Sequence, residues 1–172
     1  MDTAINAEFE VLHTRALFRH ILATIAYRGG KILRDAPEAY LSFRAGETAR
    51  TSAQILAHMA DLLEWALRLA EGTEQWRAAW RPVAPGNWNS DVARFFDALK
   101  RLDALFATAQ PSSMTIEILF QGPISDVLTH IGQLAMLRRL AGSPVRGEVM
   151  IIADVEIGRV GPDQAAPKRE FD

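Results

Sequence analysis

Residues Pro123–Gly142 read PISDVLTHIGQLAMLRRLAG, and this stretch has the features of one long helix. Proline fits the first turn of a helix and glycine fits the left-handed turn that follows the last one, so the two residues predict where a helix begins and ends. Asp126, His130 and Gln133 follow one another at spacings of four and three. Side chains at these spacings lie on one side of a helix. The stretch therefore predicts a helix with a single polar stripe.

This stripe is expected to face the interior of a helical bundle. Arg138 and Arg139 project at about 120° and 220° from Asp126, and long cationic side chains usually mark the solvent side. Several apolar residues share the arginine side of the helix, namely Ile124, Leu128, Ile131 and Ala135. An alternative therefore stays open, in which the apolar residues form a subunit contact.

Three further segments carry apolar residues at helical spacing, over residues 7–36, 51–71 and 89–109. Gly29 and Gly30 predict a kink in the first segment. Thr51 or Ser52 can cap the second, and Gly72 can end it. Asn89 or Ser90 opens the third. Four such helices of comparable length predict an all-α four-helix bundle.

The segments between and after these helices differ in composition. Residues 73–89 contain Trp76 and Trp80, and predict a long crossover connection whose aromatic side chains cover the bundle. Residues 115–118 predict a short extended piece. The apolar residues 145–160 are expected to pack along the bundle as an extended tail, whereas residues 161–172 are polar and predict a loosely ordered end.

Composition limits the classes of function. The 172 residues are 49% hydrophobic with a net charge of -2, which is typical of one globular domain over residues 1–172. Nineteen basic residues are interspersed with 21 acidic ones, so no basic run predicts binding to nucleic acid. Neither a signal peptide nor a membrane span is predicted, and the expected location is the cytoplasm. There is no cysteine, so any metal must be held by His, Asp or Glu.

A second histidine on another helix suggests a metal site. His58 lies on the inward edge of the helix predicted over residues 51–71, where Ile55, Leu62 and Leu69 fall within about 60° of it. Asp126 and His130 can converge on one ion from the last helix, and His58 can reach that ion from across the bundle. A histidine alone on an apolar face more often serves as a hydrogen-bonded core residue. The partners on the last helix favour the metal.

Two blocks of this sequence resemble the DinB superfamily. The block THIGQLAMLRRLAG over Thr129–Gly142 is similar to the signature of its last helix, and ILAHMADLLEWAL over Ile55–Leu67 is similar to its second-helix histidine segment. The resemblance covers essentially the whole chain. It implies a four-helix bundle, a homodimer and a divalent ion held by residues at positions 58, 126 and 130. Asp126 stands where the common family pattern has a histidine.

The resemblance also implies a class of activity. Several members of the superfamily transfer low-molecular-weight thiols or isomerise thiol-bound substrates, so a metal-dependent thiol S-transferase or hydrolase is expected. A His₂-carboxylate set suits zinc, nickel or manganese, and Gln133 is expected to hydrogen-bond a ligand from behind or to satisfy the helix interior. Because the chain lacks cysteine, the thiol would arrive as a small cosubstrate.

Two interpretations therefore remain. In the first the chain is a metal-dependent enzyme, for which Asp61 and Glu64 are candidate bases, although charged residues on the flank of a helix are usually solvated. In the second the polar residues form a buried hydrogen-bonded network, and a non-catalytic bundle acts through dimerisation or partner binding.

Overall fold

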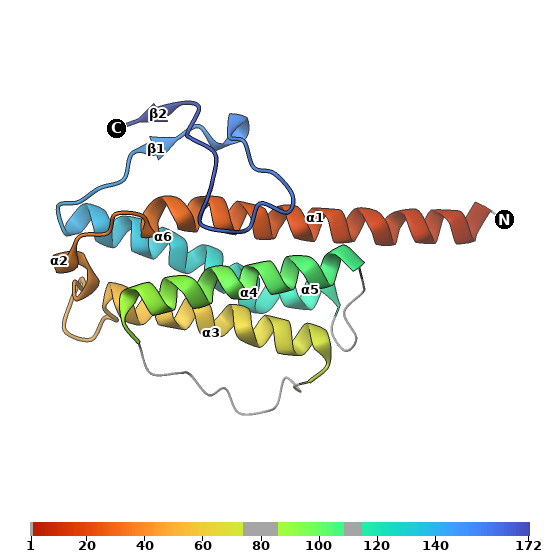
Figure 1. Cartoon of the computed structure of the whole chain (residues 1–172), viewed down its shortest axis with the longest axis horizontal. Coiled ribbons are helices and arrows are strands. Elements are labelled where there is room, and N and C mark those ends of the chain that lie inside the picture. Colours follow the sequence, from red (N-terminus) through yellow and green to blue (C-terminus); the bar gives the residue numbers. More distant parts are fainter. Residues whose placement is uncertain (1, 74–85, 109–114) are drawn as a thin grey trace.

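The computed structural model describes residues 2–73, 86–108 and 115–172. Four long helices make up most of these residues: α1 (Asp2–Leu33), α3 (Ser52–Glu71), α4 (Trp88–Thr108) and α6 (Ser125–Leu140). They lie side by side along the long axis of the molecule (Figure 1). The predicted helical bundle is confirmed. The centre of the predicted crossover, including Trp76 and Trp80, lies outside the described residues.

Each long helix packs on two neighbours, in the order α1, α4, α3, α6 and back to α1. The core between them is apolar and rich in large side chains. Among the most deeply buried are Phe18, Leu22, Tyr40, Leu56, Met59, Phe95, Leu99 and Phe106. Burying a side chain of this size stabilises the fold by about 1.5–3 kcal/mol. The packing places α3 directly beside α6, and thereby places the two predicted histidine segments next to each other.

Both ends of α3 are set by local hydrogen bonds, as the sequence predicts. The Thr51 side chain accepts a hydrogen bond from the backbone N–H of Gln54, and the Gln54 side chain accepts one from the backbone N–H of Thr51. This reciprocal pair satisfies two donors that the first turn of a helix leaves open. At the other end Gly72 adopts the left-handed conformation, with φ 73°, which glycine accepts without strain. These caps fix the two ends of the helix that carries His58.

The first helix departs from its prediction at its two glycines. It begins at Asp2, ends at Leu33 and continues through Gly29 and Gly30 without interruption. A Cβ atom on Gly29 would lie 2.8 Å from Cζ of Phe95 in α4. Glycine is therefore needed here because α1 and α4 approach each other closely, and the predicted kink is absent.

The segment before α6 is helical, and the prediction of an extended piece there is wrong. α5 (Ile116–Leu119) begins where the Thr115 side chain accepts a hydrogen bond from the backbone N–H of Ile118. A wide π-helical turn, η1 (Phe120–Ile124), then leads into α6. Pro123 lies in this turn, and it cannot donate a backbone hydrogen bond, so regular helix is interrupted there.

The C-terminal segment folds back over α1. It contains β1 (Gly147–Glu148), the 3₁₀ turn η2 (Met150–Ile152) and β2 (Glu170–Phe171), and the two strands pair antiparallel with Gly147 opposite Phe171. Val160 is buried in the core and Val145 and Val155 pack against it, as predicted, whereas Ile151, Ile152 and Ile157 of the same stretch are exposed. Residues 161–172, for which the sequence predicts a loose end, finish in β2, whose Glu170 carboxylate accepts a hydrogen bond from Lys31 of α1. A short helix α2 (Glu38–Leu41) follows α1 and carries the buried Tyr40.

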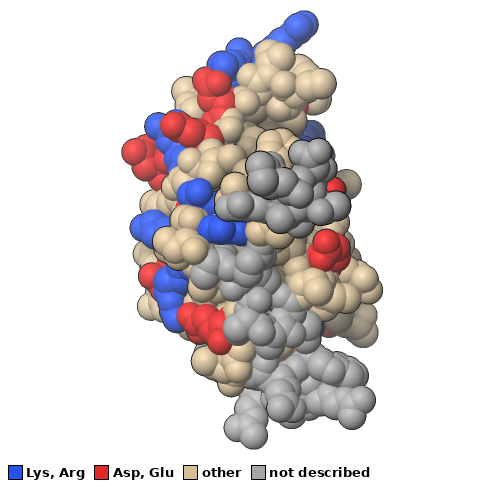
Figure 2. Space-filling view, turned by 90° about the vertical axis from the view of Figure 1, so that its right-hand side faces the viewer, with Lys and Arg blue, Asp and Glu red and all other residues tan. Residues whose placement is uncertain are grey.

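The surface shows no large region of one charge on the face in Figure 2. Lysine and arginine side chains alternate with aspartate and glutamate along one side of this end of the bundle, and the other side is mostly uncharged. Within the described ranges no helix has both the length and the apolar character that crossing a membrane requires.

Candidate functional site

The polar stripe on α6 lies mainly at the surface. Asp126, Thr129 and Gln133 are exposed and His130 is half-buried. The prediction that this stripe faces the interior is therefore wrong for Asp126 and Gln133 and holds only in part for His130. The side of α6 that enters the core carries Val127, Ile131, Leu134 and Leu137 instead.

The cause of this error is Arg138. The helical pattern predicts that Arg138 lies on the solvent side of α6, but its side chain is buried and the residue is only 6% exposed. Its guanidinium group hydrogen-bonds to backbone carbonyl groups at the end of α1, including Ile32 and Arg34. A cation that is hydrogen-bonded in this way can be buried. Arg139 is exposed as predicted.

His58 and His130 nevertheless meet, because α3 and α6 are neighbours. Their ring centroids are 4.9 Å apart and the rings are inclined at 71°, an edge-to-face arrangement. Both residues are half-buried, which places the pair at the seam between the two helices. The prediction that His58 stands at the inward edge of its helix is confirmed, since Ile55, Leu62 and Leu69 around it are buried.

Gln133 determines which nitrogen of His130 is available. Nδ1 of His130 lies 2.8 Å from Oε1 of Gln133, one turn further along α6. An amide oxygen only accepts hydrogen bonds, so the tautomer that fits this contact carries its proton on Nδ1 and keeps a lone pair on Nε2. A hydrogen bond of this kind fixes the tautomer and the orientation of metal-binding histidines. His130 is thus held with Nε2 as a possible donor atom toward a ligand.

The surroundings of His58 favour its neutral form. Burial lowers the pKa of His58, and the nearby positive charge of Arg50 and the His130 ring lower it further, against smaller opposing effects of Asp61 and Asp126. Burial penalises the protonated ring because water no longer solvates its charge. A neutral imidazole is the form that binds a metal ion or accepts a proton.

Asp126 is the predicted ligand that stands apart. It lies one turn before His130 on α6, and its charge acts on His58, but its side chain is exposed. In the parts of the chain that the structure describes, no three His, Asp or Glu side chains are gathered closely enough to hold an ion. The structure thus brings together His58 and His130 and leaves the exposed Asp126 side chain outside this pair.

A cavity of about 460 Å³ lies beside His130 of the histidine pair, and no pattern in the sequence predicts it. Residues of α3, of α6 and of the loop before α3 line it, including Ala49, Arg50, Ile55, His130 and Gln133. Its wall is mostly apolar and carries one guanidinium group. The loop has no periodic pattern, so nothing in its sequence indicates that Arg50 approaches His58.

The two candidate bases have a structural role. Asp61 is only 5% exposed, and both Asp61 and Glu64 accept hydrogen bonds from Arg94 of α4. The expectation that these carboxylates are solvated is wrong for Asp61. Both belong to an ion-pair network between α3 and α4 that also includes Asp91.

The lowered pKa of His58 predicts a dependence of stability on pH. In the unfolded chain a histidine has a pKa of about 6.5, and the folded protein binds this proton less readily. The stability contributed by neutral His58 is fully present above about pH 6.5 and is lost as the pH falls through the lower folded pKa. We expect the urea midpoint of the metal-free protein to fall more steeply with acidification than that of His58→Gln. Equal slopes in the two proteins would contradict the assignment.

Comparisons of this chain with protein-family models, with curated proteins and with solved structures find no match. The assignment of the site therefore rests on the geometry of the residues described above.

Proposed function

We propose that this chain binds a divalent metal ion through His58 and His130, with Asp126 as the third ligand. The observation that carries the proposal is the edge-to-face contact of the two imidazoles, 4.9 Å between centroids, at the seam of two adjacent helices. Bundle proteins commonly build metal sites from side chains on facing helices. The hydrogen bond from His130 Nδ1 to Gln133 leaves Nε2 available as a donor atom.

Asp126 supplies the remaining donor by a change of rotamer. It is exposed and therefore free to turn, and residues four apart on a helix have neighbouring side chains. Two imidazoles and a carboxylate are a ligand set of the catalytic type, which suits zinc and is compatible with nickel or manganese. The resemblance to the DinB superfamily points to the same three positions, and we propose membership of that superfamily on this basis.

The proposed activity is a metal-dependent thiol S-transfer or hydrolysis. A divalent ion would promote such a reaction by lowering the pKa of a coordinated water or thiol toward neutrality. The chain has no cysteine of its own, so the thiol would be a small cosubstrate. The cavity of about 460 Å³ beside His130 is the place for the electrophile, and Arg50 in its wall favours an electrophile that carries a negative charge.

The proposal is tested by measuring bound metal. The purified chain is incubated with zinc, nickel or manganese, desalted and analysed by elemental mass spectrometry. We expect about one ion per chain for at least one metal, and loss of that ion in His58→Ala and Asp126→Ala. His20→Ala is the matched control, because His20 is exposed on α1 and contributes to no part of the site.

Circular dichroism separates loss of the site from loss of the fold. A folded His58→Ala variant that still retains the ion would contradict the proposed ligand set. No ion with any of the three metals would sink the enzyme interpretation altogether.

A second candidate function, partner binding without catalysis, is favoured by one observation. Met136 and Leu140 on α6 are 57% and 56% exposed. They are four positions apart on one helix, so they form a continuous apolar patch, and such a patch can mark a contact with another chain. We propose the homodimer as the form this contact takes. Analytical ultracentrifugation tests it, because Met136→Lys is expected to yield a monomer, and a chain that is monomeric without any substitution would contradict it.

A further inference from the structure

A second cavity lies between α1 and α6 under the start of the C-terminal segment. Its volume is about 680 Å³, which is within the range of small-molecule sites. It shares only Met136 with the cavity beside His130. Nothing in the proposed metal chemistry uses this second cavity, and we refer to it as the α1–α6 groove.

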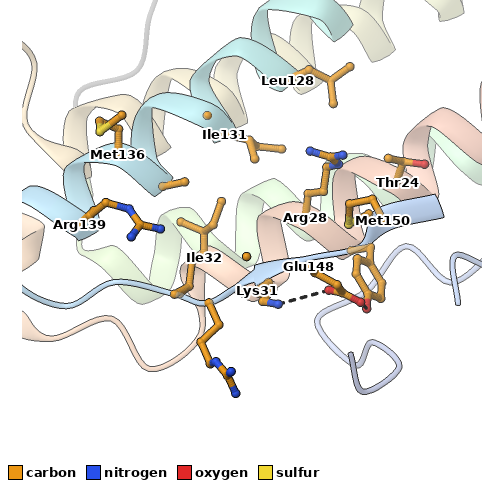
Figure 3. Close-up of a pocket in the computed structure, with 16 residues that line it drawn as sticks. Thr24, Arg28, Lys31, Ile32, Leu128, Ile131, Met136, Arg139, Glu148 and Met150 are labelled. Carbon is orange, nitrogen blue, oxygen red and sulfur yellow. Dashed lines mark hydrogen bonds and ion pairs between the residues drawn. The ribbon is translucent and has the colours of Figure 1, made fainter. Parts of the chain in front are cut away.

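Two arginines face the α1–α6 groove from opposite sides. Arg28 comes from α1 and Arg139 from α6. Figure 3 shows the Arg28 side chain extending toward Leu128 and Ile131, and the Arg139 side chain extending into the same space. Within the described ranges neither guanidinium group has a carboxylate partner or a side-chain hydrogen bond. Both are therefore available to a ligand.

The other charges around the α1–α6 groove are already matched. Lys31 Nζ lies 3.2 Å from Oε2 of Glu148 and 2.6 Å from Oε1 of Glu170, and Tyr27 donates a hydrogen bond of 2.7 Å to Glu148. Arg146 pairs with Asp172 at 3.2 Å. Arg28 and Arg139 are the surplus cations, so the groove has a net positive charge.

Much of the lining of the α1–α6 groove is apolar. The apolar lining residues are aliphatic or sulfur-containing, and they are Ile32, Leu128, Ile131, Ala135, Met136, Val145 and Met150. A guanidinium group binds a carboxylate or a phosphate through two parallel hydrogen bonds. Such a head group would meet the arginines while an apolar body packs against the apolar lining.

We propose that the α1–α6 groove binds a small amphiphilic anion, an oxyanion head group on an apolar body. The head group is a carboxylate or a phosphate monoester. Each of these groups presents two oxygen atoms that can accept the parallel hydrogen bonds of a guanidinium group. The binding does not depend on the proposed metal site, since the two sites have different charged residues.

The test is isothermal titration calorimetry of the metal-depleted full chain with four probes. They are octanoate, octyl phosphate, inorganic phosphate and octyl glucoside. We expect at least one of the octyl anions to bind at one site, and both inorganic phosphate and the neutral glucoside to bind at least about tenfold more weakly. The tighter of the two octyl anions identifies the head group. No binding by either octyl anion, or equal binding by the glucoside, would overturn the proposal.

Variants locate the ligand. Arg28→Gln and Arg139→Gln are each expected to weaken binding by about tenfold or more. Arg101→Gln is the matched control, because Arg101 is an exposed arginine of α4 that lies outside the groove, and it is expected to bind like the parent chain.

Gly132→Leu tests the cavity itself without weakening the helix. A Cβ atom on Gly132 would have no heavy atom within 4 Å, and Gly132 lines the α1–α6 groove. A leucine there projects into the groove and replaces a residue of low helix propensity. We expect an unchanged or higher melting temperature and no binding of the octyl anion. Full binding by this variant would show that the anion lies elsewhere, and would overturn the proposal.

Discussion

Replacing Arg138 with methionine is expected to destabilise the protein by about 3 kcal/mol or more. The guanidinium group donates to the carbonyl oxygens of Ile32 at 2.8 Å, Arg34 at 2.9 Å and Ser143 at 2.9 Å. Two of these carbonyls stand at the end of α1, where the last turn of a helix leaves its acceptors open. Methionine keeps the apolar contacts of the stem but leaves these buried acceptors without a donor.

The neighbouring residue provides the control for this variant. Arg139 follows Arg138 in sequence but is exposed, so Arg139→Met is expected to change the free energy of unfolding by less than about 0.5 kcal/mol. Urea unfolding of both variants measures the difference. Equal midpoints for Arg138→Met and Arg139→Met would contradict the role assigned to Arg138.

Replacing Arg94 with methionine is expected to cost about 3–5 kcal/mol. Arg94 of α4 donates to Asp61 at 2.5 Å, to Asp91 at 2.9 Å and to Glu64 at 3.1 Å. The side chains of Asp61 and Asp91 are 5% and 2% exposed. Burial by itself lowers the pKa of Arg94, but the three carboxylates outweigh it and raise the pKa above its usual value. Removing the cation leaves two buried negative charges facing one another across the α3–α4 interface.

Two further variants make this expectation specific. Arg101→Met is the control on the same helix, because its pair with Asp97 is 3.9 Å long with both partners more than half exposed, and such pairs contribute little. Adding Asp61→Asn and Asp91→Asn to Arg94→Met is expected to restore part of the lost stability by removing the two buried negative charges that face Arg94. Thermal unfolding measures all three proteins, and a triple variant less stable than Arg94→Met alone would contradict the electrostatic explanation.

The sequence predicts the helices well wherever the deciding interactions are local. The bounds of α3 follow from Thr51 and Gly72, which act within one turn of the helix ends. The position of His58 follows from the apolar residues around it on the same helix. Its meeting with His130 follows in turn, because adjacent helices of a bundle bring their inward edges together.

The errors occur where the deciding partner is distant in the chain. Arginine is a residue type that usually faces solvent. The carbonyl groups of Ile32 and Arg34 that allow the burial of Arg138 are more than 100 positions away in the chain. Asp61 is buried for a similar reason, because Arg94 on another helix compensates its charge. Helical periodicity describes one segment at a time and contains no information about such partners. Helical periodicity therefore predicts an inward-facing stripe on α6, although the structure exposes most of it.

A zinc titration followed by NMR of the histidine side chains shows whether His58 and His130 bind one ion together. The chain has only four histidines, so every imidazole signal can be assigned with single variants. We expect the signals of His58 and His130 to change together and to reach saturation at about one zinc ion per chain, while those of His13 and His20 stay in place. Signals of His58 and His130 that do not respond to zinc, or that respond only after those of His13 and His20, would contradict the proposed metal site.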